Sequence, residues 1–169
     1  MDCVLVRHGS AVARDEWEGS DADRPLTERG AKRVAQMAAG LRRLDVQPTH
    51  VLSSPLIRAI ETATIVHRAL RVHAAVQIVD ALLPDAPANR LLSILHDFPP
   101  ESCVRCIGHE PQLGMAASEI ELSFFHGSRM RDCSENNRSL FRSHDGVGCW
   151  KARSIRRPLF GVVWSAWFV

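Results

Sequence analysis

The stretch Cys3-Val4-Leu5-Val6-Arg7-His8-Gly9 decides how this chain is expected to fold. Its first four residues form a short, continuous apolar run, which is typical of a strand that is buried on both faces of a sheet. Arg7 and His8 follow directly, so they are expected where the strand ends and a loop begins. A strand of this kind predicts further strands beside it and helices over both of its faces.

Extended and helical patterns alternate along the rest of the chain. Thr27 is the expected N-cap of a helix whose apolar residues recur as far as Leu41. Pro55 is expected at the first position of a second helix, which continues to about residue 70. The other expected elements are strands over residues 51–53, 76–79 and 103–107, a helix over residues 89–96 and a helix opened by Pro111. Strands that alternate with helices predict a three-layer α/β/α sandwich with a mostly parallel central sheet.

Two further segments place charged or titratable side chains at strand ends. Ser54-Pro55-Leu56-Ile57-Arg58 follows the second expected strand, and Gly108-His109-Glu110-Pro111 follows the fourth. In parallel sheets, ligands bind beyond the carboxyl ends of the strands, so this pattern gathers His8, Arg58 and His109 at one edge. Guanidinium groups match phosphate oxygens, and imidazole is a nucleophile at neutral pH. The set therefore predicts a site for a phosphoryl group.

Each of the four side chains has an expected role. Neutral His8 is the expected nucleophile, which attacks phosphorus to form a covalent phosphohistidine that water later hydrolyses. Arg7 and Arg58 are expected to clamp the phosphoryl oxygens, and His109 to donate a hydrogen bond to the charge that develops in the transition state. Arg58 also lies in the first turn of its expected helix, where backbone amides and the helix dipole favour an anion.

Several of these segments, taken in order, resemble a known family. Arg7-His8-Gly9, the Ser-Pro-x-x-Arg-Ala-x-x-Thr pattern at residues 54–62 and Gly-His-Glu-Pro at residues 108–111 resemble the histidine phosphatase superfamily, whose fold is phosphoglycerate mutase-like. Arg24-Pro25-Leu26-Thr27-Glu28-Arg29-Gly30 makes the chain similar to SixA-type phosphohistidine phosphatases. The resemblance covers about residues 1–117.

That resemblance implies a phosphate pocket and a substrate class. The pocket consists of Arg7, His8, Arg58 and His109, with His8 phosphorylated, and neither a metal nor an organic cofactor is implied. Family members that act on small phosphate esters carry an insertion over the pocket, but only 37 residues separate Leu70 from Gly108. The expected substrate is therefore a phosphorylated protein, such as a histidine-containing phosphotransfer domain that carries phosphohistidine.

Alternatives to this function stay open from the sequence. A broad small-molecule phosphomonoesterase would use the same four residues, and a non-catalytic phosphate-binding or interaction module would bind phosphate without turnover. Asp80 and Asp85 lie where related phosphatases often place a carboxylate, but neither is assigned as the general acid. The acidic cluster from Asp15 to Asp23 predicts a loop beside the pocket.

Composition argues against several other classes of protein. A net charge of +2 at pH 7, with basic residues spread along the chain, does not predict nucleic-acid binding. The longest apolar stretch, Leu159 to Val169, is too short to span a bilayer, so no membrane partner is expected. The cysteines are odd in number and no leader-like segment precedes the first strand, which predicts a reduced cytoplasmic setting.

Cys103 and Cys106, followed by His109, are spaced as in some redox or metal sites. On a strand, however, residues three positions apart point to opposite faces of the sheet. No second ligand pair follows at the spacing of a zinc site. The sequence therefore favours a structural role for the two cysteines.

The last third of the chain departs from the pattern of the first two thirds. Residues 118–169 hold five of the six phenylalanines and three of the four tryptophans, and residues 135–139 and 143–146 are typical of loops. The resemblance implies a helix and closing strands here, but the strands are not recognisable. We therefore divide the chain into a histidine phosphatase core, residues 1–117, and a divergent part of the same domain, residues 118–169. One hypothesis is that this part packs poorly and exposes Trp164, Trp167 and Phe168.

Overall fold

The expected first strand lies inside a six-stranded sheet. A computed structural model describes residues 1–43, 48–127, 148–151 and 161–166, and the strand order is β3-β2-β4-β1-β6-β5. The strands are β1 (Asp2–Arg7), β2 (His50–Ser53), β3 (Val76–Ile78), β4 (Cys103–Gly108), β5 (Gly148–Lys151) and β6 (Gly161–Ala166). The α-helices are α1 (Glu28–Arg43), α2 (Ile57–Leu70), α3 (Ala88–His96) and α4 (Gln112–Gly127). Three short 3-10 helices are η1 (Arg14–Glu16), η2 (Asp21–Asp23) and η3 (Asp80–Leu82).

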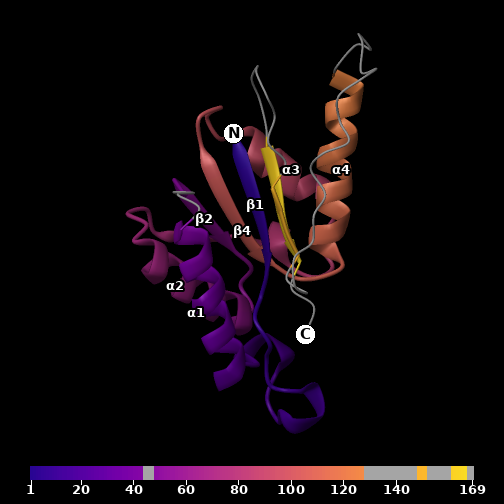
Figure 1. Cartoon of the computed structure of the whole chain (residues 1–169). Coiled ribbons are helices and arrows are strands. Elements are labelled where there is room, and N and C mark those ends of the chain that lie inside the picture. Colours follow the sequence, from indigo (N-terminus) through magenta and orange to yellow (C-terminus); the bar gives the residue numbers. More distant parts are fainter. Residues whose placement is uncertain (44–47, 128–147, 152–160, 167–169) are drawn as a thin grey trace.

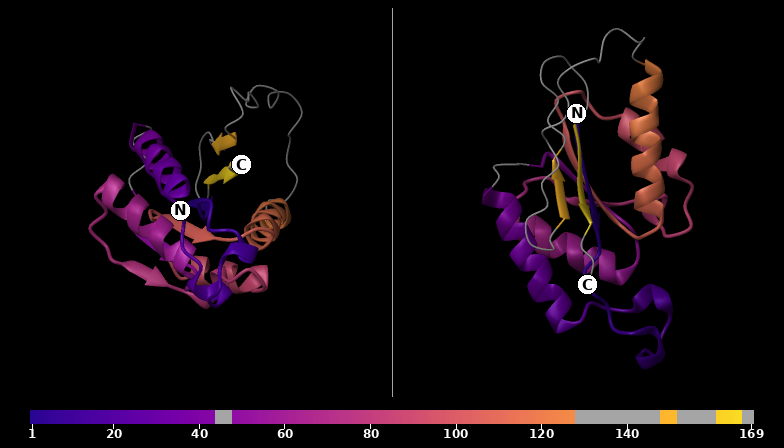
Figure 2. Two further views of the ribbon diagram at one scale, coloured as in Figure 1. Left: turned by 90° about the horizontal axis from the view of Figure 1, so that it is seen from below. Right: turned by 45° about the vertical axis from the view of Figure 1, so that its right-hand side comes forward.

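Helices cover both faces of the sheet, as Figure 1 shows, and Figure 2 shows the layers from two further directions. Val4 and Val6 of β1 pack in one buried cluster with apolar residues of α1 and α2. Cys3 and Leu5 point the other way, into a second cluster with residues of α3 and α4. This alternation is what a strand buried on both faces requires. The three-layer α/β/α sandwich is confirmed.

Parallel pairing brings three strand ends to one edge of the sheet. β1 pairs in parallel with β4, with Arg7 opposite Gly108. β2 pairs in parallel with the other side of β4, with Ser53 opposite Ile107. The residues that follow these strands therefore leave the sheet at the same edge, and the predicted site residues are among them.

At element boundaries the structure confirms one sequence prediction, the N-cap of the first helix, and differs from others. Thr27 is the N-cap of α1, because its Oγ1 accepts a hydrogen bond of 3.0 Å from the backbone N–H of Gly30. The second helix begins at Ile57 instead of Pro55, because Leu56 is still extended. The Ser54 hydroxyl contacts a histidine across the site, as described below. β3 ends one residue earlier than expected, at Ile78.

The closing strands that the sequence analysis did not recognise are present. β6 pairs in parallel with β1, and β5 pairs antiparallel with β6 at the edge of the sheet. α4 extends past residue 117 to Gly127. The predicted loops at residues 135–139 and 143–146, and residues 167–169, lie outside the described residues, as do the side chains of β6. The division of the chain at residue 117 stays a prediction. None of the helices in the described ranges is long and apolar enough to cross a membrane.

The first turn of α1 touches the loop that follows β1. A Cβ atom at Gly30 would clash with the backbone oxygen of Ser10, which also accepts a hydrogen bond from the Thr27 N–H. We expect Gly30→Ala to lower the free energy of unfolding by about 1–3 kcal/mol, because backbone must move to admit the methyl group. Urea denaturation measures this change.

Gly40 on the same helix is the matched control. A Cβ atom there would meet nothing within 4 Å. Gly40→Ala is expected to raise the free energy of unfolding by about 1 kcal/mol, because alanine loses less backbone entropy in a helix. Equal stability of the two variants would contradict the close approach of α1 to Ser10.

Candidate active site

The structure brings the four predicted site residues into one cavity. Arg7 is the last residue of β1, His8 follows it, Arg58 is the second residue of α2, and His109 follows β4. All four line a cavity of about 460 Å³. The other lining residues are Gly9, Ser10, Ala11, Arg24, Arg33, Val34, Met37, Pro84 and Glu110. The site therefore contains more positive charge than the sequence analysis expected.

His8 is held in one tautomer by the backbone of the next residue, Gly9. Its Nδ1 lies 2.7 Å from the carbonyl oxygen of Gly9. A carbonyl only accepts hydrogen bonds, so Nδ1 donates and carries the proton of the neutral ring. The lone pair is then on Nε2. A nucleophile of this kind needs a free lone pair at a fixed position.

His109 lies against His8, with ring centroids 4.8 Å apart and ring planes inclined by 55°. Its Nε2 is 2.8 Å from the Oγ of Ser54, which also accepts a hydrogen bond from the Leu56 N–H. The Ser54 hydroxyl can donate its proton to Nε2, and in that arrangement the ring proton of neutral His109 is on Nδ1. That Nδ1 is buried and has no hydrogen-bond partner within the described part of the chain. It is a donor available to a ligand.

Burial keeps both imidazoles uncharged. Desolvation, reinforced by the charges of Arg58 and Arg7, lowers the pKa of His8 to about 4 against the opposing hydrogen bond to Gly9. Desolvation, with His8 and Arg58 adding to it, lowers the pKa of His109 to about 3. At neutral pH the cavity therefore holds neutral imidazoles, while its positive charge is carried by guanidinium groups.

Thr62 ties the His8 loop to the helix that carries Arg58. Its Oγ1 accepts a hydrogen bond of 3.1 Å from the Gly9 N–H and donates one of 2.7 Å to the Arg58 carbonyl. A Cβ atom at Gly9 would lie 2.6 Å from Cγ2 of Val34, so the loop passes close to α1. Ser54 and Thr62 thus support the site, and both belong to the Ser-Pro-x-x-Arg-Ala-x-x-Thr pattern. That pattern was the signal available in the sequence.

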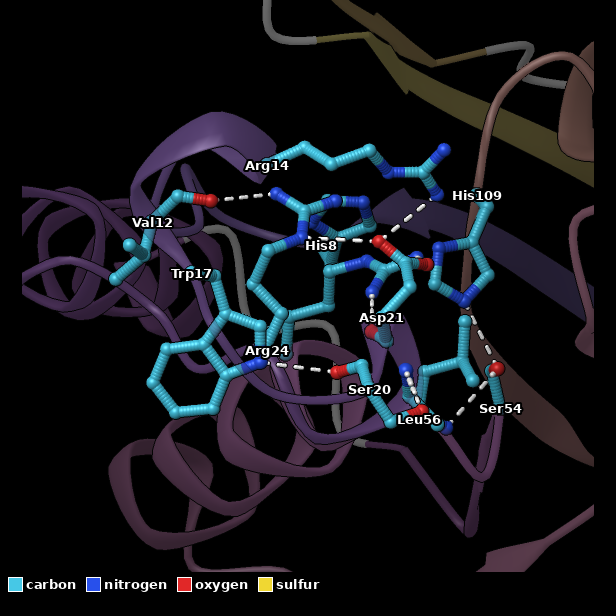
Figure 3. A network of polar contacts seen from close by, with 12 residues as sticks. His8, Val12, Arg14, Trp17, Ser20, Asp21, Arg24, Ser54, Leu56 and His109 are labelled. Carbon is cyan, nitrogen blue, oxygen red and sulfur yellow. Dashed lines mark hydrogen bonds and ion pairs between the residues drawn. The ribbon is translucent and has the colours of Figure 1, made fainter.

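Arg58 is buried and meets an acidic residue from the first loop. Its guanidinium contacts Asp21 on η2, with Nη2 3.1 Å from Oδ2 and Nη1 2.7 Å from the backbone oxygen. Arg24 and Arg14 contact the same carboxylate, each at 3.0 Å from Oδ1. Figure 3 shows Asp21 beside Arg14 and Arg24, with His8 and His109 close by. The predicted loop beside the pocket thus supplies an acidic partner for these arginines, which the sequence analysis missed.

The other candidates from the sequence lie elsewhere. Asp80 and Asp85 are exposed and do not line the cavity, whereas Glu110 does. In the described ranges, no three or more His, Cys, Asp or Glu side chains are grouped to hold a metal ion. The face of β4 that carries Cys106 packs toward α3 and α4, opposite to that of Ile107. The Sγ of Cys106 lies 4.0 Å from the Sγ of Cys3 in that cluster.

Comparison with known proteins places this geometry in a family. Residues 3–83 match the histidine phosphatase superfamily, branch 1. An uncharacterized protein of Picosynechococcus sp. is 34% identical over 123 residues, which cover 71% of this chain and 73% of that protein. The phosphohistidine phosphatase SixA of Escherichia coli K12 is 30% identical over 122 residues, which cover 71% of this chain and 74% of SixA.

Solved structures agree with the sequence relatives. The structure of the protein histidine phosphatase SixA complexed with tungstate has a TM-score of 0.64 and 29% identity, and covers 69% of this chain and 74% of that one. A mycobacterial glucosyl-3-phosphoglycerate phosphatase has the same fold, with a TM-score of 0.52 and 17% identity over 69% of this chain and 77% of its own.

The fold and the site define an α/β protein of the phosphoglycerate mutase-like class, with a cationic pocket at the carboxyl edge of its sheet. The chain belongs to the histidine phosphatase superfamily. Membership of this superfamily supports the assignment of the chain as a phosphatase.

The low pKa values of the two histidines predict how the rings titrate. We expect the NMR resonances of the His8 and His109 rings to stay those of neutral imidazole as pH falls to about 5, because both pKa values lie near 4 or below. A midpoint above pH 6 for His8 would contradict the desolvation described here.

The stability of the protein should depend on pH because of the same two histidines. The unfolded chain binds protons on these histidines near pH 6.5, whereas the folded chain does not until about pH 4 at His8 and about pH 3 at His109. The two histidines therefore have no such effect above pH 6.5 and lower the stability of the folded chain increasingly as pH falls from 6.5 toward 3. Urea denaturation at a series of pH values measures this loss.

Proposed function

We propose that the protein removes the phosphoryl group from phosphohistidine on a protein substrate through a covalent intermediate on His8. The observation that carries the proposal is a set of polar groups without partners on three residues that line the cavity. His8 offers a free Nε2 lone pair, while Arg58 Nε and His109 Nδ1 are buried donors without a partner in the described residues. A phosphoryl group would satisfy all three, because it has an electrophilic phosphorus and several acceptor oxygens.

Two displacements follow from this arrangement. Nε2 of His8 attacks phosphorus, the bond from phosphorus to the substrate nitrogen breaks, and that nitrogen leaves with a proton from solvent or from a nearby acid. Arg7 and Arg58 hold the phosphoryl oxygens, and His109 donates its Nδ1 proton to one of them as charge builds up. Water then attacks the phosphohistidine and releases inorganic phosphate, which restores neutral His8.

The choice of a protein substrate is supported by what lies beside the cavity. Residues 71–102 fold as β3, η3 and α3 with their connectors, and β4 begins at Cys103, so this part of the chain contains no extra domain over the pocket. Asp80 and Asp85 do not line the cavity. A phosphoramidate depends less on a strong acid than a phosphate ester does, because its P–N bond is labile. The relative SixA of Escherichia coli carries the name of a phosphohistidine phosphatase. The cytoplasm stays the predicted compartment.

The test is phosphate release from a histidine-phosphorylated protein by the purified chain. We expect His8→Ala to lower the rate by about 10³-fold or more, because the nucleophile is lost. Wild-type protein should accumulate an acid-labile phosphoenzyme that is absent from the variant. His73→Ala is the matched control, since His73 is exposed and does not line the cavity.

Comparison of substrates separates the alternatives. Faster turnover of a phosphosugar than of the phosphoprotein, still dependent on His8, would identify a small-molecule phosphomonoesterase. Binding of inorganic phosphate without turnover of either substrate would identify a phosphate-binding module. Either result would overturn the proposed substrate, and the second would also overturn the activity.

A further inference from the structure

The first loop contributes a carboxylate, that of Asp21, which contacts two arginines that line the cavity. Asp21 contacts Arg58 and Arg24, which both line the cavity, and Arg14, whose side chain is 78% exposed. Asp21 itself is not among the residues that line the cavity. Its carboxylate is 33% exposed, and hydrogen bonds from Arg14 and Arg24, with the charge of Arg58, outweigh its partial desolvation and lower its pKa to about 2. Asp21 is thus a permanent anion beside the site.

Asp21 engages one particular edge of the Arg58 guanidinium. The two terminal nitrogens, Nη1 and Nη2, donate to the backbone oxygen and to Oδ2 of this single residue. A guanidinium has a second edge, formed by Nε–H and the other N–H of Nη2, which can also bind an oxyanion bidentately. The Nε of Arg58 is buried and has no hydrogen-bond partner among the residues described. Arg58 lines the cavity, so the Nε edge is the part of its guanidinium that Asp21 leaves for a ligand there.

We propose that Asp21 is a positioning residue: it holds the outer edge of Arg58 so that the Nε edge receives the phosphoryl group. This inference rests on the proposed function for the identity of the ligand as a phosphoryl group. A guanidinium clamped on one edge loses little rotamer freedom when it binds on the other. Arg24 is oriented by the same carboxylate through its Nε and by the Val12 carbonyl through its Nη1, 2.6 Å away.

A positioning role and a charge-balancing role for Asp21 predict opposite changes in phosphate affinity when Asp21 is neutralised. If Asp21 only offset positive charge, its neutralisation would make the cavity more cationic and would tighten the binding of an anion. If Asp21 positions Arg58, its neutralisation loosens the guanidinium and weakens the binding of phosphate in spite of the added positive charge. The sign of the change in phosphate affinity therefore decides between them.

The experiment is calorimetric titration of inorganic phosphate into the full chain and its variants. Asp21→Asn is expected to raise the Kd by about 10-fold or more, because hydrogen bonds between charged groups are lost. Asp23→Asn is the matched control: Asp23 ends the same 3-10 helix, is exposed, and makes no side-chain hydrogen bond or ion pair with the described residues. It removes the same charge, and its Kd should stay within about 2-fold of wild type or tighten.

The Arg58→Ala background shows whether Asp21→Asn changes the Kd for phosphate by way of Arg58. In that background, Asp21→Asn should raise the Kd by clearly less than it does in the wild-type background, because Arg58 is absent and only the contact of Asp21 with Arg24 is left to lose. Tighter phosphate binding by Asp21→Asn in the wild-type background would overturn the proposal, as would a Kd equal to that of Asp23→Asn.

A measurement on the wild-type protein covers the case in which Asp21→Asn does not fold. Saturating phosphate should shift the Nε–H resonance of Arg58 in a ¹⁵N-labelled sample, because that proton gains an oxyanion acceptor. An unchanged resonance would overturn the proposal. Binding is read without turnover in all of these experiments. A chain that binds phosphate as expected but hydrolyses no phosphohistidine would therefore disprove the proposed function and leave the role of Asp21 intact.

Discussion

Parallel pairing of β1, β4 and β2 is the constraint on which the site depends. Because these strands run in the same direction, the residues just beyond Arg7, Ser53 and Gly108 leave the sheet at one edge. His8, Ser54 and His109 are those residues, and they come from segments about 50 residues apart along the chain. An antiparallel arrangement would send neighbouring strand ends to opposite edges and would separate them. The hydrogen bond between Ser54 and His109 and the contact of the two imidazoles follow directly from this pairing.

The charged arginines and the neutral histidines of the site have different electrostatic roles. Guanidinium groups keep their charge when they are partly buried, whereas imidazoles in the same environment become neutral. Arg58 and Arg7 therefore supply a fixed positive field, and that same field helps to keep His8 unprotonated. A lysine in place of Arg58 would give a point charge without the second edge that remains open beside Asp21. Attraction of an anion and availability of the nucleophile thus reinforce one another.

The sequence was sufficient to predict an element or a site residue where the local pattern and the long-range contacts agree. β1 is a continuous apolar run, Thr27 is a capping residue before an apolar stripe, and His8, Arg58 and His109 each follow a strand. It was insufficient where a residue acts through a distant partner. Asp21 lies in a run of acidic residues, and nothing local shows that Arg58, 37 positions later, meets it. The contact of Ser54 with His109 likewise depends on the strand pairing, which no local pattern shows. The stretch Leu159 to Val169 contains β6, which was not recognisable from its sequence.

The pairing of β6 with β1 has a consequence for the time at which the sheet is completed. Asp2 lies opposite Cys103 on one side and Gly161 on the other. β1 is therefore flanked by two strands that come much later in the sequence, and both pairings close long loops. Such a topology has high contact order and favours slow folding. A ribosome-bound chain that lacks residues 161–166 would present one side of β1 as an unpaired edge, which another strand could join. Pairing of β6 with β1 thus completes the core and protects that edge from association.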